Sequence, residues 1–201
     1  MFRCAKTFCF LAVLILLTSF LGCGPSSEDA RQQLSRAGVP VSSDAVIKSI
    51  HNGDVRAVEL LLDAGLDPNK PDSQGRIPLI EAAIKNRSAM VKILLDRNAD
   101  PNIKPDHYGQ TALMLAASLG RGEIVKTLLA HGAAPNLRDD ANSQTALIMA
   151  TIKGHTDIVK TLLAHGADRE LRDHDGFTAL DYARKLDHQG LIQVLEQARG
   201  K

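Results

Sequence analysis

The sequence predicts an all-α repeat solenoid in which helix-turn-helix units are joined by β-hairpin loops. Three observations predict it: an apolar segment recurs along the chain, a second apolar segment recurs in step with it, and loops containing Gly, Pro and Asn separate the pairs. A single unit of this kind cannot bury its own apolar face, whereas stacked neighbours bury it between them. We therefore expect an elongated array in which each repeat contacts only the next.

The first recurring segment predicts the first helix of each unit. Its copies begin at Ile77, Thr111, Thr145 and Thr178, at intervals of 34, 34 and 33 residues. A Thr hydroxyl at the start of a helix accepts a hydrogen bond from a free backbone N–H. Leu and Ala residues three and four positions apart then share one helical face, and the small Ala side chains allow neighbouring helices to approach closely.

The second recurring segment predicts the second helix. Residues 123–133 and 157–167 both contain the run Ile-Val-Lys-Thr-Leu-Leu-Ala-His-Gly-Ala. Its Ile, Val and Leu residues form an apolar helical face. We expect Gly132 to end the helix in the left-handed conformation, and Pro135 prevents helical continuation. Weaker copies of the segment lie at residues 56–62 and 89–95.

These repeats resemble the ankyrin repeat, a unit of about 33 residues with a Thr-Pro-Leu-His pattern. The resemblance covers nearly all of the chain after its N-terminal segment and implies about five repeats within residues 41–199, the first of them incomplete. Before them, residues 23–40 contain a polar stretch, Ser26–Asp29, which we interpret as a tether, and a half-repeat that ends at Gly38. The expected repeat boundaries are 41–71, 72–105, 106–139, 140–172 and 173–199.

The sequence departs from the family pattern within the first helix and within one hairpin. The His of the pattern is replaced by Ile80, Met114 and Ile148, and by Asp181 in the last repeat. We expect the three apolar replacements to form a stripe along the array. Ser143 stands where the other hairpins have Gly, which predicts a less regular turn. The last repeat is rich in charged and amide side chains, which is typical of a cap that faces water.

The first 22 residues form a separate segment. Arg3 and Lys6 precede the uncharged apolar stretch Thr7–Gly22, and Cys23 follows. A short basic start, an apolar core and a small residue before a break are typical of a secretory signal peptide. The stretch is also shorter than the roughly 20 residues that a membrane span needs.

The residues Leu21-Gly22-Cys23 resemble the lipobox of bacterial lipoproteins. The resemblance implies cleavage after residue 22 and lipid attachment at Cys23, and two or more acyl chains anchor a protein stably. An Asp directly after the lipidated Cys favours inner-membrane retention in Gram-negative lipoproteins, and Gly24 is not that signal. The expected location is therefore the outer membrane, with a periplasmic domain. The alternatives are an uncleaved N-terminal anchor, with Cys23 an incidental cysteine, or a secreted protein.

The composition argues against several classes of function. The net charge is +1 and only 3% of the residues are aromatic, so neither a basic footprint nor stacking surfaces for nucleic acid are expected. Two of the three Cys residues lie in the signal segment, which leaves Cys23 alone and excludes a disulfide framework. The chain has no nucleophile elbow, Walker A loop or dinucleotide-binding Gly motif.

No catalytic residue, cofactor or metal site is predicted. His131 and His165 occupy equivalent positions in adjacent repeats, but packed helices lie on the order of 10 Å apart. That distance is too long for two ligands of one zinc ion, whose Zn–N bonds are about 2.0–2.1 Å. The Asp and Glu residues are scattered at positions typical of the family surface, and we interpret them as a solvated face.

The resemblance implies a protein-binding surface on the hairpin tips and on the first helix of each pair. Tyr108 and Phe177 are the strongest candidates for anchors of an interface, since rigid aromatic side chains often carry binding energy. For Phe177, near the end of the array, packing is the favoured interpretation, while for Tyr108 binding and the shielding of neighbouring hairpins are equally weighted. The candidate residues are Gln74, Arg76, His107, Tyr108, Gln110, Asn142, Gln144, His174, Asp175 and Phe177.

The sequence therefore predicts a non-catalytic, membrane-anchored module of the bacterial cell envelope that binds another protein through a monomeric ankyrin domain. Two alternatives remain open. The first is an inhibitor or immunity protein that masks a toxin or an envelope enzyme. The second is a structural envelope lipoprotein without a specific partner. Repeat surfaces of this kind have no readable code, so the sequence does not identify the partner.

Overall fold

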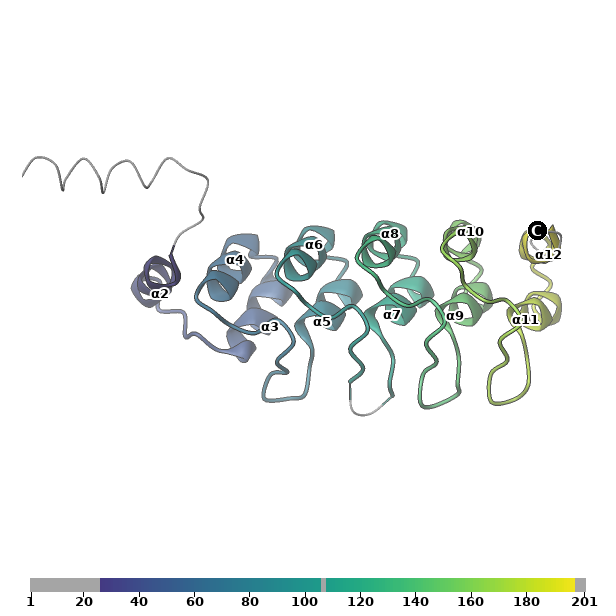
Figure 1. The fold of residues 1–201 in the computed structure, drawn as a ribbon, viewed down its shortest axis with the longest axis horizontal. Helices are drawn as coiled ribbons and strands as arrows, with labels where there is room; N and C mark the ends of the chain where they lie inside the picture. Colours follow the sequence, from purple (N-terminus) through teal and green to yellow (C-terminus); the bar gives the residue numbers. More distant parts are fainter. Residues whose placement is uncertain (1–25, 106–107, 198–201) are drawn as a thin grey trace, which may run out of the picture.

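The computed structural model describes residues 26–105 and 108–197, which form one elongated row of stacked helix pairs (Figure 1). Eleven helices and no β-strand are assigned within these residues, and the predicted all-α repeat solenoid is confirmed. The signal segment, Cys23 and His107 lie outside the described residues. The helices are α2 (Ser27–Arg36), α3 (Ser43–Asn52), α4 (Val55–Asp63), α5 (Pro78–Ile84), α6 (Ser88–Asp96), α7 (Ala112–Ser118), α8 (Gly122–Ala130), α9 (Ala146–Ile152), α10 (Thr156–Ala164), α11 (Ala179–Lys185) and α12 (Gln189–Gln197).

The helices lie in two layers. Helices α3, α5, α7, α9 and α11, here called the inner helices, run along the middle of the molecule in Figure 1. The outer helices α4, α6, α8, α10 and α12 form the layer above them, and the loops between successive repeats project below them. The inner helices are therefore the layer next to the hairpin loops.

Local chemistry determines where the inner helices begin. The hydroxyl of Thr145 accepts a hydrogen bond of 3.3 Å from the N–H of Ile148, and Thr178 caps α11 with a bond of 3.2 Å from the N–H of Asp181. Helix α5 has no side-chain cap and starts with Pro78, whose fixed φ suits a first helical turn. The predicted role of Thr as a helix cap is confirmed.

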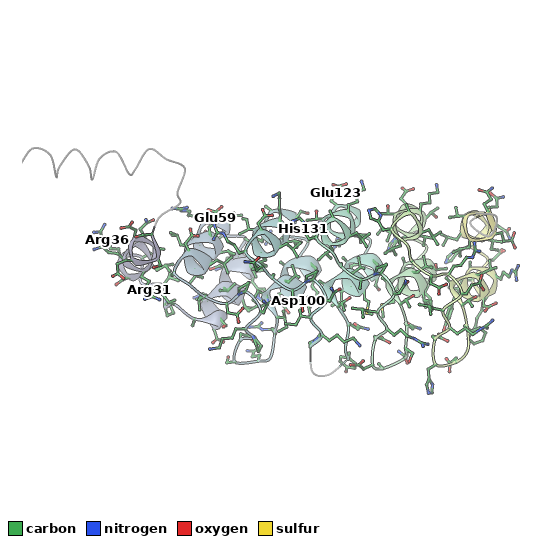
Figure 2. The ribbon with its side chains drawn as sticks, in the orientation of Figure 1. Arg31, Arg36, Glu59, Asp100, Glu123 and His131 are labelled. Atoms are coloured by element: carbon green, nitrogen blue, oxygen red, sulfur yellow. The ribbon has the colours of Figure 1, made fainter. Side chains whose placement is uncertain are left out.

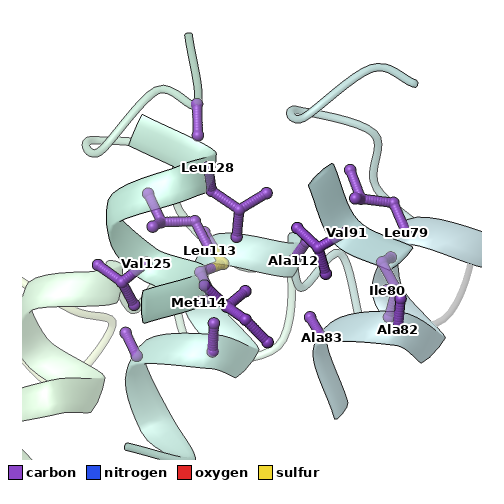
Figure 3. Close-up of a cluster of buried hydrophobic side chains, with 14 of the residues drawn as sticks. Leu79, Ile80, Ala82, Ala83, Val91, Ala112, Leu113, Met114, Val125 and Leu128 are labelled. Carbon is purple, nitrogen blue, oxygen red and sulfur yellow. The ribbon is translucent and has the colours of Figure 1, made fainter. Parts of the chain in front are cut away.

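The core lies between the layers and between successive repeats (Figure 3). Small side chains such as Ala83 and Ala112 alternate with large ones such as Leu113, so that neighbouring helices pack closely. The three apolar replacements are all buried and belong to this core. The predicted stripe therefore lies inside the stack, and it contributes to packing instead of to the binding surface. Its members are Ile80, Met114 and Ile148.

The N-terminal end of the stack is covered by α2. Our interpretation of Ser26–Asp29 as a tether is wrong, because these residues start this helix. The Ser26 hydroxyl accepts from the N–H of Asp29, while the Asp29 carboxylate accepts from the Ser26 N–H, a reciprocal capping box. Helix α2 packs on α4 through Ala30 and Leu34, both buried, and Arg31 donates a 3.1 Å hydrogen bond to the carbonyl of Ala64.

Asparagine side chains link each outer helix end to the next repeat. Asn102 Nδ2 donates to the carbonyl of Gly132 at 3.2 Å, and its Oδ1 accepts from the N–H of Ala134 at 2.7 Å. Asn69 and Asn136 make the equivalent pair of bonds in the repeats on either side. These bonds fix the register between repeats, so the exposed surface of one repeat is held relative to the next.

Candidate interaction surface

Three of the four hairpin tips are each built around a buried aspartate. The tips are residues 72–76, 139–144 and 173–177, together with 108–110 of the remaining hairpin. In the first three, the carboxylate of the first residue accepts hydrogen bonds from two backbone N–H groups across the turn, at 2.8–3.1 Å. The expectation that the acidic residues form a solvated face is therefore wrong for three of them, because the turn needs an acceptor at its base. They are Asp72, Asp139 and Asp173, all less than a tenth exposed.

Hydrogen bonds keep two of these carboxyl groups ionised. Burial raises the pKa of Asp72, but bonds from the Arg76 side chain and from the backbone of Arg76 and Gln74 outweigh it and lower the pKa below its ordinary value. In the same way, burial raises the pKa of Asp173, and hydrogen bonds from Tyr182, Phe177 and neighbouring groups lower it further than burial raises it. These aspartates stabilise the turns as anions.

Neighbouring tips are joined through their backbones. The N–H of Asp140 donates to the carbonyl of Tyr108 at 3.0 Å, and the N–H of His174 donates to the carbonyl of Asn142 at 2.8 Å. Ser143 keeps the left-handed φ (56°) that the glycines adopt elsewhere. The predicted irregularity of this hairpin is present, but it comes from an extra residue, since Asp139 bonds to Gln144 where Asp72 bonds to Arg76.

Several of the candidate residues belong to the scaffold of the tips. Arg76 donates to Asp72 through Nε (2.8 Å) and Nη2 (2.6 Å). Gln110 and Gln144 donate to the carboxylate of the next tip along the chain, at 3.3 and 3.5 Å. Their guanidinium and amide groups are therefore partly used within the chain.

The two aromatic candidates differ in their surroundings. Tyr108 is 66% exposed at its tip. Phe177 is half-buried against Tyr182, with ring centroids 5.5 Å apart, and the ammonium of Lys185 lies 5.0 Å from its ring centre. Of these two candidates, Tyr108 is the one that presents an exposed aromatic surface. The remaining described candidates are exposed at the tips: Gln74, Asn142, His174 and Asp175.

The sequence analysis expected binding positions on the first helix of each pair, which is the inner helix, but it missed the apolar residues of that surface. A hollow between α7 and α9 is lined by Gln110 and Gln144 from the tips and by Ser118, Met149, Ile152 and Lys153 from the helices. Leu119, at the end of α7, is 43% exposed, and Leu186 at the end of α11 is 44% exposed. The sequence did contain a signal for the exposure of Leu119. Leu119 occupies the position that Lys153 holds in the next repeat, and a lysine is almost always exposed.

Four His side chains bond to backbone carbonyls or neighbouring side chains: His51, His131, His155 and His165. His131 and His165 each contact a carbonyl of their own helix through Nδ1, at 2.8 and 2.9 Å, while His155 contacts the carbonyl of Ser118 in the preceding repeat at 3.1 Å. Within residues 26–105 and 108–197 no group of three or more His, Cys, Asp or Glu side chains could hold a metal ion. Nor does any helix in these ranges have the length and apolar character needed to span a bilayer.

A family model for ankyrin repeats matches three overlapping stretches of the chain, residues 14–105, 45–139 and 131–200. The chain belongs to the ankyrin repeat family. The resemblance inferred from the recurring segments is thereby confirmed, and ankyrin repeats are typically modules for binding other proteins, without catalytic activity. Figure 2 shows that side chains of many kinds cover this ankyrin stack along its whole length.

One curated relative contains a related segment. "Zygote-specific protein 3" of Chlamydomonas reinhardtii is 37% identical to this ankyrin chain over 89 residues. The match covers 44% of this chain and 21% of that protein. The shared segment is therefore a small part of the relative.

Proposed function

We propose that this protein is a membrane-anchored, non-catalytic ankyrin adaptor of a bacterial cell envelope. In this proposal, lipidated Cys23 holds the stack at the outer membrane, and the hairpin tips with the inner helices bind a partner protein as a monomeric domain. The observation that carries the binding role is Tyr108, a rigid aromatic side chain left 66% exposed on a row of tips joined by backbone hydrogen bonds.

The geometry of the tips supports binding because little order has to be created when a partner arrives. Asp139 and Asp173 fix their turns internally, and the bonds from Asp140 and His174 fix each turn to its neighbour. A preorganised surface loses less conformational entropy on association than a flexible loop does. An exposed Tyr on such a surface adds large contact area at low entropic cost.

The anchor is supported by the N-terminal sequence. The basic start, the uncharged stretch Thr7–Gly22 and the Leu-Gly-Cys run ending at Cys23 occur in the order expected for a lipoprotein signal. Metabolic labelling with a clickable palmitate analogue tests it. We expect label on the wild-type protein in the outer-membrane fraction and none on Cys23→Ser, whereas an unlabelled wild-type protein contradicts the anchor.

The binding role is tested by placing a photo-crosslinking amino acid at Tyr108 in living cells. The matched control position is Glu123 on outer helix α8, whose side chain is 79% exposed. We expect a discrete crosslinked protein from Tyr108 alone, identified by mass spectrometry. Identical products at both positions, or none at Tyr108, contradict the proposal. The captured protein also separates an envelope scaffold from an inhibitor that masks a toxin or an envelope enzyme.

A further inference from the structure

The first unit of the stack has an outer helix but no inner helix among the described residues. Helix α2, at the end of the row in Figure 1, packs on α4, and Gly38 after it has the left-handed φ of Gly65 after α4. Each later outer helix packs on an inner helix that precedes it in the chain, whereas the described chain begins at Ser26, directly before α2. Within residues 26–105 and 108–197, no inner helix therefore stacks on the N-terminal side of α3.

A hollow of about 270 Å³, here called the N-terminal hollow, lies on this side of α3. Lys48 and Asn52 of α3 line it, and in the repeat register they correspond to Met149 and Lys153 of α9. Met149 and Lys153 line the hollow between α9 and the preceding inner helix α7. The same side of α3 and α9 thus faces the place of a preceding inner helix, and α7 fills that place for α9.

Small side chains form the floor of the N-terminal hollow. Ala45 and Ser49 line it four residues apart, so they lie on one face of α3. They are 6% and 7% exposed, whereas the corresponding residues of α9, Ala146 and Ala150, are 1% and 0% exposed where α9 packs on α7. The floor therefore has the short side chains that let another helix approach as closely as α7 approaches α9.

The rim of the N-terminal hollow does not favour a highly charged occupant. Its charged side chains are two carboxylates and one ammonium group. The carboxylate of Asp44 accepts from Ser73, and that of Asp54 caps α4 by accepting from the N–H of Ala57. Lys48 stands four residues after Asp44 on the same helix, where opposite charges attract. This near balance of charge, together with the small side chains of the floor, indicates an uncharged helix as the occupant.

The chain before α2 contains such a segment in the matching register. In three later units the inner helix begins 20 residues before the loop residue with left-handed φ: Pro78 before Asn98, Ala112 before Gly132, and Ala146 before Gly166. Twenty residues before Gly38 is residue 18, and an inner helix of seven residues from there covers 18–24. The family model for ankyrin repeats begins its match at residue 14, so the matched stretch includes this segment.

The side chains of the segment suit the place of an inner helix. Phe20 corresponds to Met114, a large apolar residue buried in the core, and Gly22 corresponds to Ala116, a small buried one. Ser19 departs from the pattern, since four later units have Leu at its position. The segment contains no charged residue, which agrees with the near balance of charge at the rim of the hollow.

We propose that residues 18–24 of the uncleaved chain dock in the N-terminal hollow and complete the first repeat as its inner helix. The Phe20 side chain then enters the hollow above its floor. Only Pro25 and Ser26 link the segment to α2, so it is held at a high effective concentration beside the hollow. A segment of the same chain is therefore favoured over a second copy, and burial of its apolar side chains drives the docking.

The inference goes beyond the proposed function and concerns the chain before its signal segment is removed. Cleavage after Gly22 removes residues 18–22, five of the seven docked residues, and leaves only Cys23 and Gly24 of the segment. The hollow is then open in the lipidated protein, and it stays filled in a chain that keeps its N-terminal segment. Processing thereby changes the end surface of the stack.

The test measures disulfide formation from Cys23, which lies within the docked segment. The full chain is made by cell-free synthesis in non-ionic detergent, and its intact mass confirms that it is uncleaved and unlipidated. Cys4→Ser and Cys9→Ser leave Cys23 as the single thiol. Ser49→Cys places a second thiol on the floor of the hollow, and Ser35→Cys, exposed on α2, is the matched control.

The pair Cys23 and Ser49 tests the docked register. In the repeat register it corresponds to Ala117 on α7 and Ala150 on α9, both 0% exposed on helices that pack together. A disulfide requires Cα atoms no more than about 7 Å apart. Oxidation by copper phenanthroline should therefore join Cys23 to the Ser49→Cys thiol within one chain at least about fivefold faster than to the Ser35→Cys thiol.

A second pair of variants tests the apolar contact. Phe20→Asp places a carboxylate in the hollow and should slow the disulfide with the Ser49→Cys thiol by about fivefold or more, because an unpaired charge resists burial. Leu11→Asp makes the same change in the same apolar stretch but outside residues 18–24, and it should leave the rate within about twofold. Circular dichroism and thermal unfolding confirm that every variant is folded.

Several outcomes overturn the inference. They are equal disulfide rates for the Ser49→Cys and Ser35→Cys thiols, an unchanged rate in Phe20→Asp, and equal slowing by Phe20→Asp and Leu11→Asp. A disulfide that forms only between two chains also overturns it, since a second copy would then occupy the hollow.

The proposed function is scored separately, by palmitate labelling at Cys23 and by the Tyr108 crosslink in cells. A labelled protein together with a negative disulfide result removes only the docking inference. A fast disulfide in the uncleaved chain together with an unlabelled protein in cells removes only the lipid anchor.

Discussion

The hydroxyl of Tyr182 on α11 donates a 2.6 Å hydrogen bond to the buried carboxylate of Asp173 at the base of the preceding hairpin. The same carboxylate group accepts the backbone N–H of Phe177 across the turn. An inner helix is thereby tied to its own hairpin tip. The hydrogen bond to Asp173, together with burial, raises the pKa of Tyr182 to about 12, because a phenolate here would lose the bond and repel the carboxylate.

Alkaline pH should therefore destabilise this end of the stack. The pKa of Tyr182 is raised above the ordinary value of 10, so its contribution is complete below pH 10 and is lost as the pH rises towards 12. Tyr182→Phe removes a hydrogen bond to a charged group and should lower the free energy of unfolding by about 1.5–3 kcal/mol at pH 8. Urea titrations at pH 8 and pH 11 measure both effects, and the difference between wild type and variant should shrink at pH 11. The exposed Tyr108→Phe is the control, and a difference that is independent of pH would contradict the assignment.

Acidic pH should destabilise the first tip, so the stability of this tip falls as the pH decreases. The pKa of Asp72 is lowered by its bonds to Arg76 and Gln74, so the stabilisation is present above the ordinary value of 3.8 and is lost as the pH falls through the lowered value. Asp72→Asn can still accept the backbone N–H groups but loses the charged pair with Arg76. We expect a loss of about 1–3 kcal/mol at pH 7 that diminishes below pH 4, measured by urea unfolding. Asp175→Asn, exposed on another tip, should change stability little at either pH.

The asparagine links predict where cooperativity between repeats is most sensitive. Asn102→Ala removes one donor and one acceptor between successive repeats and should lower the free energy of unfolding by about 1–2 kcal/mol. Because each repeat contacts only its neighbours, the urea transition should also broaden. Asn142→Ala is the matched control, since its side chain is exposed at a tip, and it should cost less than about 0.5 kcal/mol. Equal losses for the two variants would show that the link does not couple the repeats.

The repeat register could be predicted from the sequence because it depends on local patterns. Thr145 and Thr178 recur at the start of a helix, and the apolar residues that follow them recur with helical spacing, so a cap and a buried face are both visible without coordinates. The start of α2 also depends on a local pattern, because Ser26 and Asp29 form a capping box. The polar composition of the segment led us to interpret it as a tether instead of a helix.

The parts of the surface that could not be predicted depend on packing between repeats. Asp139 and Asp173 are 34 residues apart, and this recurrence was a signal, but an aspartate is ordinarily solvated and only the folded turn gives it a buried role. The exposure of Leu119 depends likewise on which side of α7 remains uncovered after stacking.

The two aromatic tip residues should separate binding from stability. Tyr108 is 66% exposed, so Tyr108→Ala should leave the urea midpoint unchanged while weakening binding of the crosslinked partner by about 1–2 kcal/mol, roughly tenfold in Kd. Phe177 packs on Tyr182 and beneath the Lys185 ammonium. Phe177→Ala should therefore lower the free energy of unfolding by about 1–2 kcal/mol, since it removes an aromatic pair and a cation–π contact. Urea unfolding and a binding titration on both variants give four values. If Tyr108→Ala destabilises the fold as much as Phe177→Ala does, Tyr108 shields its neighbouring hairpins, and the binding surface has to be sought on the inner helices alone.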